Sequence, residues 1–115
     1  MNINKFTQKS MEAVQNCEKL AYEHGNQQLE QEHLLYSLLT LEDSLILKLI
    51  TKMNISKEMF MNEAEQAVNR LTKVSGGGQL YVSNDLNKVL ISAEDEAKAM
   101  GDEYVSVEHL FLAML

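Results

Sequence analysis

Two Glu-His pairs, Glu32-His33 and Glu108-His109, are the residues of this sequence whose types could support chemistry. A carboxylate beside an imidazole is common in acid-base catalysts and in metal sites. Adjacent residues on a helix point about 100° apart, so neither pair can converge on a metal ion as histidines spaced i, i+4 do. We expect helix-start roles instead, because a carboxylate in a first helical turn gains about 0.3–1 kcal/mol from the helix dipole. The histidines are expected to pack in the core.

Cys17 and a glycine run are the other candidates for chemistry. A nucleophilic cysteine needs a base fixed beside it, and His24 lies two helical turns along, about 10 Å away. The spacing of Cys17 with Val14 and Ala21 predicts a core position instead. The run Gly76–Gly78 is followed by neither a lysine nor a hydroxyl residue that could hold phosphate and magnesium. The sequence therefore predicts no enzyme and no cofactor within this chain.

Both Glu-His pairs belong to an internal duplication with a constant offset of 76 residues. A repeat of this kind decides the fold class, so it takes precedence over single motifs. The paired positions are Thr7 and Ser83, Glu18 and Glu94, Ala21 and Ala97, Gly25 and Gly101, Leu29 and Val105, Glu32 and Glu108, His33 and His109, and Leu34 and Leu110. Each Glu-His pair therefore follows a helix that begins at a hydroxyl residue and ends at a glycine.

Apolar residues at three- and four-residue spacing predict six helices. The predicted helices run from Thr7 to His24, Glu30 to about Leu41, Leu45 to Met53, Ser56 to Leu71, Ser83 to Met100, and from near Ser106 to Leu115. The third helix is apolar almost all round, so we expect it to be the most buried element. Core positions are also expected for five methionines, namely Met11, Met53, Met59, Met100 and Met114.

The stretch 72–82 interrupts this pattern and contains Ser75-Gly-Gly-Gly78, so we predict an irregular, mobile linker there. The predicted organisation is a first repeat at 1–71, the linker at 72–82, and a second repeat at 83–115 within one compact domain. The second repeat lacks counterparts of Asp43 to Leu71. We therefore expect a piece of a longer polypeptide.

Composition and charge restrict the partners. The chain has 115 residues, a formal net charge of −7 and a sequence pI of about 4.9, which disfavours nucleic acid and anionic membranes. One cysteine cannot form an internal disulfide, and Met1 is not followed by a charged leader and apolar run. No apolar run approaches the roughly 20 residues that span a bilayer. A soluble, cytoplasmic protein is expected.

Three stretches resemble the N-terminal domain of the ClpB disaggregase family: Lys5-Phe-Thr-Gln-Lys-Ser10, Lys73-Val-Ser-Gly-Gly-Gly-Gln-Leu-Tyr-Val-Ser83 and Gly101-Asp-Glu-Tyr-Val-Ser-Val-Glu-His-Leu110. The resemblance covers the whole chain. It implies an all-α domain of two pseudo-symmetric four-helix repeats, the second of them incomplete here. It also implies a flexible tether to a hexameric ATP-driven motor that threads aggregated proteins, with ATP and Mg²⁺ bound only in the motor modules. A co-chaperone system of the DnaK type is a further implied partner.

The resemblance implies that Thr7, Asp102 and Glu108 contact unfolded or aggregated polypeptides. Their positions at the termini of helices make it plausible that they meet at one surface. Leu80, Tyr81 and Tyr104 lie in connectors, where apolar residues have less reason to be buried, so they are candidate apolar neighbours.

An alternative function comes from the related ClpC and ClpA N-domains, which bind adaptor proteins or phosphoarginine-marked substrates. In those relatives a helix-start glutamate and a nearby hydroxyl hold the marked arginine. Thr7 with Glu32, and Ser83 with Glu108, match both positions in this sequence. Both functions make the chain a binding module.

Overall fold

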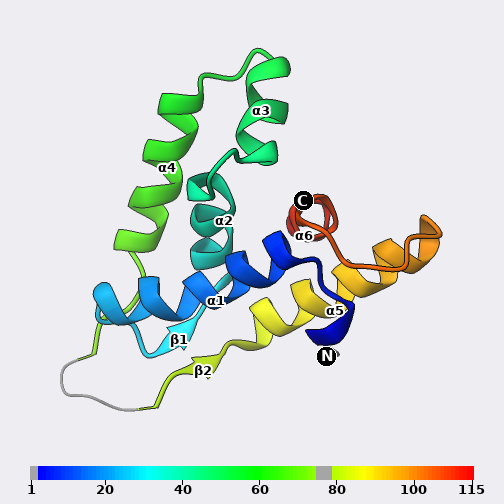
Figure 1. Cartoon of the computed structure of the whole chain (residues 1–115). Helices are drawn as coiled ribbons and strands as arrows, with labels where there is room; N and C mark the ends of the chain where they lie inside the picture. Colours follow the sequence, from blue (N-terminus) through cyan, green and yellow to red (C-terminus); the bar gives the residue numbers. More distant parts are fainter. Residues whose placement is uncertain (1–2, 75–78) are drawn as a thin grey trace.

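The computed structural model describes residues 3–74 and 79–115, and these are mostly helical, as predicted (Figure 1). A 3₁₀ turn at Ile3–Lys5 precedes the first helix. The helices are α1 (Gln8–Glu23), α2 (Gln31–Thr40), α3 (Leu45–Lys52), α4 (Lys57–Asn69), α5 (Asn84–Ala99) and α6 (Val107–Met114). Two short strands, β1 (Gln28–Leu29) and β2 (Tyr81–Val82), lie before α2 and α5.

Local side-chain chemistry determines where the helices begin. A hydroxyl oxygen accepts a hydrogen bond from a first-turn amide at Thr7, Ser44, Ser56 and Ser83, which are the N-caps of α1, α3, α4 and α5. Beyond the ends of α1 and α5, Gly25 and Gly101 have φ angles of 72° and 73°. A glycine adopts this left-handed conformation without a steric penalty, so both helices end where the sequence predicts.

The two repeats are interlocked by equivalent backbone pairings. β1 and β2 pair in parallel, with Leu29 opposite Val82, and an isolated parallel bridge joins Phe6 to Val105. Phe6 and Val82 are counterparts in the duplication, as are Leu29 and Val105. The segment before the first helix of each repeat therefore pairs with the segment before the second helix of the other repeat.

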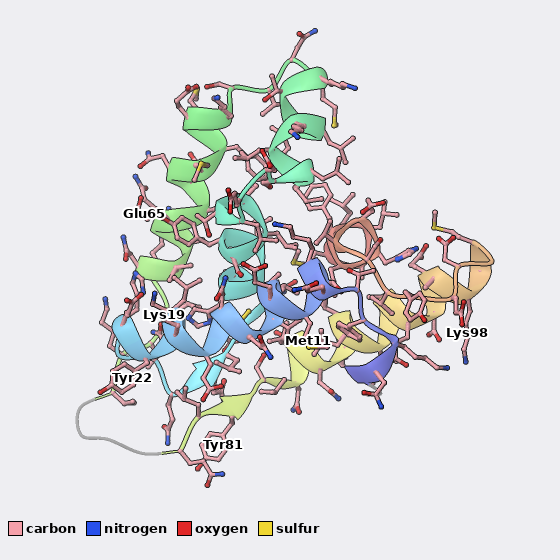
Figure 2. The ribbon with its side chains drawn as sticks, in the orientation of Figure 1. Met11, Lys19, Tyr22, Glu65, Tyr81 and Lys98 are labelled. Atoms are coloured by element: carbon pink, nitrogen blue, oxygen red, sulfur yellow. The ribbon has the colours of Figure 1, made fainter. Side chains whose placement is uncertain are left out.

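The prediction of an irregular linker at 72–82 is wrong at its C-terminal end, because Tyr81 and Val82 form β2. The Tyr81 side chain points away from the body of the molecule (Figure 2). Upstream, the Val74 N–H donates to the Gly25 carbonyl at 2.9 Å, which holds that part of the segment against the end of α1. The stretch 75–78, which holds the glycine run and on which the mobility prediction mainly depends, lies outside the described residues.

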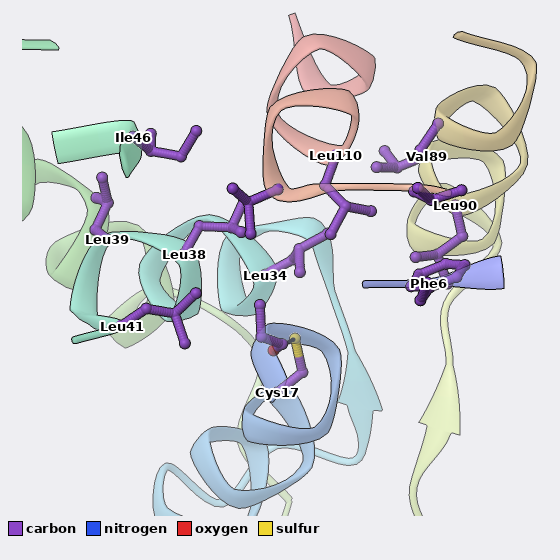
Figure 3. Close-up of a cluster of buried hydrophobic side chains, with 14 of the residues drawn as sticks. Phe6, Cys17, Leu34, Leu38, Leu39, Leu41, Ile46, Val89, Leu90 and Leu110 are labelled. Carbon is purple, nitrogen blue, oxygen red and sulfur yellow. Dashed lines mark hydrogen bonds between the residues drawn. The ribbon is translucent and has the colours of Figure 1, made fainter. Parts of the chain in front are cut away.

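The hydrophobic core lies where α1 packs on α2 and α5 packs on α6 (Figure 3). Leu34 and Leu38 of α2 and Leu110 of α6 are completely buried at its centre. Cys17 of α1 is buried in the same cluster, as predicted, and its thiol donates to the Ala13 carbonyl at 3.4 Å. Burial raises the pKa of the Cys17 thiol to about 12, so the group is a protonated packing residue at neutral pH.

The prediction that the third helix is the most buried element is wrong. Only Ile46 and Ile50 of α3 are buried, whereas Leu45, Leu49 and Met53 are 41%, 38% and 64% exposed. The reason is the position of α3 in a hairpin with α4 at one edge of the molecule, where neighbouring helices contact one side of it (Figure 1).

Three of the five methionines expected in the core are also exposed, namely Met53, Met59 and Met100. They lie near helix ends, where neighbouring helices do not cover them. Met11 and Met114 do pack against the core.

Candidate functional site

The candidate site residues gather at two equivalent places where the repeats pair. At the first, here called the α1–α6 junction, the Thr7 N–H donates to the Val105 carbonyl at 2.9 Å, and the Val105 N–H donates to the Lys5 carbonyl at 2.7 Å. At the second, the α5–α2 junction, the Ser83 N–H donates to the Leu29 carbonyl at 3.0 Å. Each junction brings the start of one helix beside the segment that leads into another.

This pairing sorts the candidate residues into two groups. Thr7, Asp102, Tyr104 and Glu108 belong to the α1–α6 junction, whereas Glu32, Leu80, Tyr81 and Ser83 belong to the α5–α2 junction. The structure therefore places the Thr7 hydroxyl beside the segment that leads to Glu108, and Ser83 beside the segment that leads to Glu32. The expected grouping of Thr7 with Asp102 and Glu108 is compatible with this arrangement, whereas the pairs Thr7 with Glu32 and Ser83 with Glu108 are separated by it. Sequence analysis also assigned Leu80 and Tyr81 to the surface of Thr7, from which the backbone pairing separates them.

The buried histidine of the α1–α6 junction has a structural role. His109 Nδ1 accepts from the Ser106 backbone N–H at 2.9 Å, so the ring proton lies on Nε2. Nε2 then donates to a carboxylate oxygen of Asp102 at 2.9 Å. One imidazole therefore caps α6 and holds Asp102 in place at the same time.

The α5–α2 junction repeats this arrangement with one change of chemistry. His33 Nδ1 accepts from the Glu30 backbone N–H at 2.9 Å, and its Nε2 donates to the amide oxygen of Asn26 at 2.9 Å. Asn26 is the counterpart of Asp102 in the duplication. The amide is neutral and buried, whereas the carboxylate is charged and its side chain is 48% exposed. The α1–α6 junction therefore presents a charge that the other junction lacks at this position.

Burial lowers the pKa of His33 to about 4, and the nearby His24 contributes in the same direction. The imidazole is therefore neutral at pH 7, as its hydrogen bonds require. This agrees with the expected core position of the histidines and leaves His33 little scope for proton transfer at neutral pH.

The Thr7 hydroxyl is largely committed to the start of α1. Its Oγ1 accepts from the Ser10 N–H at 3.2 Å and donates to the Ser10 hydroxyl at 2.9 Å. The buried Ser10 hydroxyl donates in turn to the Val105 carbonyl at 2.7 Å, which fixes the α1–α6 junction from inside. Sequence reasoning missed Ser10, because its counterpart in the second repeat is Leu86 and the duplication gives no signal there.

Asp102 and Glu108 line different hollows on the surface. Asp102 lies in one of about 370 Å³ with Lys5, Glu94 and Lys98 among its neighbours. Glu108 lies at the edge of an apolar hollow of about 470 Å³ between α3 and α6. Asp102 is held by His109 and Glu108 lies in the first turn of the same helix, but the two carboxylates do not share one cavity.

The described residues contain no cluster of three His, Cys, Asp or Glu side chains that could hold a metal ion. Among residues 3–74 and 79–115, no helix has the length and apolar character needed to cross a bilayer.

Comparison with known proteins identifies relatives along the whole chain. Residues 5–115 match the family described as the Clp repeat (R) N-terminal domain. The chaperone protein ClpB of Porphyromonas gingivalis is 42% identical over 115 residues, which are 100% of this chain and 13% of that protein. The chaperone protein ClpB of Nitratidesulfovibrio vulgaris is 39% identical over 119 aligned residues, which cover 100% of this chain and 14% of that protein. The chain thus spans a small part of the length of these relatives.

Solved structures share the fold at lower identity. The Hsp104 N-terminal domain from Candida albicans has a TM-score of 0.86 at 22% identity, and the match covers 95% of this chain and 72% of that one. A ClpV N-domain in complex with a VipB peptide has a TM-score of 0.75 at 19% identity, covering 96% of this chain and 68% of that one. These likenesses confirm an all-α fold of the Clp N-domain type. Together with the family match over residues 5–115, they lead to one conclusion: the chain belongs to the Clp repeat (R) N-terminal domain family, in the form that ClpB chaperones carry.

Proposed function

We propose that this chain is the substrate-recognition module of a ClpB-type ATP-dependent disaggregase. In this proposal it binds unfolded or aggregated polypeptides weakly in the cytoplasm and passes them to a hexameric motor in the same full-length protein. A co-chaperone system of the DnaK type is part of the proposal by family likeness alone. The observation that carries the binding role is the α1–α6 junction, which presents two exposed carboxylates: Asp102, held by His109, and Glu108 in the first turn of α6.

The geometry favours an extended polypeptide as the ligand. Exposed carboxylates at a helix start accept hydrogen bonds from backbone amides and cationic side chains, which every unfolded protein offers. Tyr104 is 50% exposed in the connector between Asp102 and Glu108 and adds apolar contact. Exposed hydrogen bonds contribute only about 0.5–1.5 kcal/mol each, so binding is weak and poorly specific. Weak binding suits a module that must release its substrate to a motor. The peptide complex of a ClpV N-domain supports peptide binding by this fold.

The test removes each charge without disturbing the fold. Asp102→Asn keeps an acceptor for His109 Nε2, because Asn26 serves the same role in the other repeat. Glu108→Gln keeps the shape of the first turn of α6. We expect each variant to bind a fluorescently labelled unfolded protein severalfold more weakly, as measured by anisotropy, with unchanged helical circular dichroism.

The matched control is Glu58→Gln, which removes an exposed carboxylate from the first turn of α4, away from both junctions. It should bind as the wild type does. Wild-type affinity in both junction variants, or an equal loss in the control, would show that the acids at the α1–α6 junction are ordinary helix-end residues.

A second candidate function is the binding of adaptor proteins or phosphoarginine, as in ClpC-like and ClpA-like N-domains. The observation that favours it is the presence of a hydroxyl residue and a helix-start glutamate at both junctions. Ser83 is buried and its hydroxyl caps α5, so the α1–α6 junction, where Thr7 is half-buried, is the better place for such a ligand. Competition between free phosphoarginine and the unfolded protein would distinguish the two candidates.

A further inference from the structure

Helix α3 has two apolar faces, and the structure buries one of them. Ile46 and Ile50 face the core and Leu47 is half-buried, whereas the other residues of α3, and Met53 directly after it, are exposed to solvent. Five of these exposed residues, namely Leu45, Lys48, Leu49, Lys52 and Met53, are here called the α3 stripe. Their spacing of i, i+3, i+4, i+7 and i+8 places them along one side of the helix. The α3 stripe is therefore a continuous exposed surface of alternating apolar and basic groups.

The charge of this surface is opposite to that of the molecule as a whole. Lys48, Lys52 and the nearby Lys57 line an open hollow of about 560 Å³, and no acidic residue contributes to its lining. None of the three ammonium groups forms a hydrogen bond or ion pair with another described residue. The whole chain carries a formal net charge of −7. An acidic partner is thus repelled by the average surface and attracted at the α3 stripe.

The apolar part of the stripe continues toward α6. Leu49 and Met53 also line the apolar hollow of about 470 Å³, together with Phe111, Leu112 and other side chains of α6. Lysine stems that cover isolated leucines are ordinary surface features. Here the three large apolar side chains of the stripe lead into a second apolar surface, and contiguous patches of this kind mark interaction sites.

We infer that the α3 stripe docks an amphipathic helical segment of a partner protein, with an apolar seam flanked by glutamate or aspartate residues. Charge complementarity selects this partner: the seam covers Leu45, Leu49 and Met53, while the acidic residues meet Lys48 and Lys52. Helices that lie along a partner surface use the same i, i+3, i+4 anchors that the stripe presents. The site differs in position and in charge from the α1–α6 junction, so it adds a second binding surface to the proposed function.

The experiment uses a designed helical peptide of about 16 residues with leucines at i, i+3 and i+4 spacing and flanking glutamates. A matched peptide carries glutamine in place of every glutamate. Binding to the full 115-residue chain is measured by fluorescence anisotropy at low and at physiological salt. The glutamate peptide should bind more tightly than the glutamine peptide, and the difference should shrink as salt screens the exposed charges.

Paired charge reversals locate the site. Lys48→Glu/Lys52→Glu should weaken the glutamate peptide by about tenfold or more, because two attractions become repulsions. The control Lys19→Glu/Lys88→Glu changes the net charge equally at exposed positions of α1 and α5 and should change binding by less than about twofold. Asp102→Asn should bind the peptide normally, so the result is independent of the junction. Circular dichroism checks the fold of every variant.

Several outcomes would overturn the inference. An equal loss in the Lys19/Lys88 control would mean a general charge effect, and equal binding of the two peptides would mean that charge plays no part. If neither peptide binds, and the chain instead binds phosphatidylserine vesicles in a way that Lys48→Glu/Lys52→Glu abolishes, the stripe binds a lipid surface and not a helical peptide. Self-association of the wild type that disappears in Lys48→Glu/Lys52→Glu would assign it to a second copy of this chain.

Discussion

At the scale of single residues, Asp102 combines a structural and a surface role. Its carboxylate accepts a hydrogen bond from Nε2 of His109 at 2.9 Å, and its side chain is half-exposed. Removing the acceptor leaves a buried N–H without a partner, which costs about 1–3 kcal/mol. We therefore expect Asp102→Ala to lower the free energy of unfolding by that amount in urea denaturation.

Asp102→Asn is the matched comparison, since it supplies the acceptor that Asn26 provides to His33. It should unfold within about 0.5 kcal/mol of the wild type, because the buried hydrogen bond is kept. Equal destabilisation by both substitutions would show that the carboxylate charge, and not the hydrogen bond, stabilises the start of α6. Asp102→Ala removes both the charge and the hydrogen-bond acceptor, so on its own it could not separate a loss of substrate binding from a loss of stability.

His33 makes a pH-dependent contribution to stability. Its pKa falls from an ordinary 6.5 to about 4 in the folded chain, chiefly through burial. The unfolded state therefore binds a proton more readily, so this contribution is fully present above pH 6.5 and is lost as the pH falls toward 4. We expect the ring protons of His33 to titrate in NMR spectra with a midpoint near 4. A midpoint near 6.5 would contradict the buried, neutral ring.

At the scale of the elements, the sequence predicts the features that depend on neighbouring residues, such as the ends of helices. The hydroxyls of Thr7 and Ser83 and the glycines at 25 and 101 mark helix ends correctly, because caps depend on residues a few positions apart. The buried face of a helix depends on which other helices reach it. For α3 the two lysines, Lys48 and Lys52, lie on the face of Leu49, so the sequence carried a signal for its exposure that the expectation of an all-round apolar helix did not use.

The residue types of the candidate site were predictable, but the sequence left two groupings open: Thr7 with Glu32, or Thr7 with Asp102 and Glu108. The 76-residue offset identifies Thr7, Ser83 and both helix-start glutamates from the sequence. The segment before the first helix of one repeat pairs with the segment before the second helix of the other repeat. This pairing depends on the tertiary structure, and it places Thr7 near the segment before Glu108. The histidine caps carried a usable signal that was overlooked. Glu30 and His33, like Ser106 and His109, have the N-cap to N3 spacing of a capping box.

At the scale of the whole molecule, the duplication leaves the two repeats unequally covered. In the first repeat α4 packs against α2 and shields its outer face. Within residues 1–115 the second repeat has no counterpart of α3 or α4 to cover α6. Leu112 and Leu115 are 44% and 84% exposed beside the apolar hollow between α3 and α6.

This uncovered surface predicts that the 115-residue chain self-associates. Apolar area is driven from water at about 25 cal/mol per Å², so burying the α6 surface between two copies favours association. Sedimentation velocity should show a concentration-dependent rise in mass. Leu112→Lys should weaken this association by about tenfold or more, because it places a charge in the apolar surface. The charge reversal at Lys48 and Lys52 should weaken it much less, since neither lysine lines the apolar hollow. If the chain is a monomer at every concentration, the apolar surface between α3 and α6 is too well covered to bind a second copy, and the prediction is wrong.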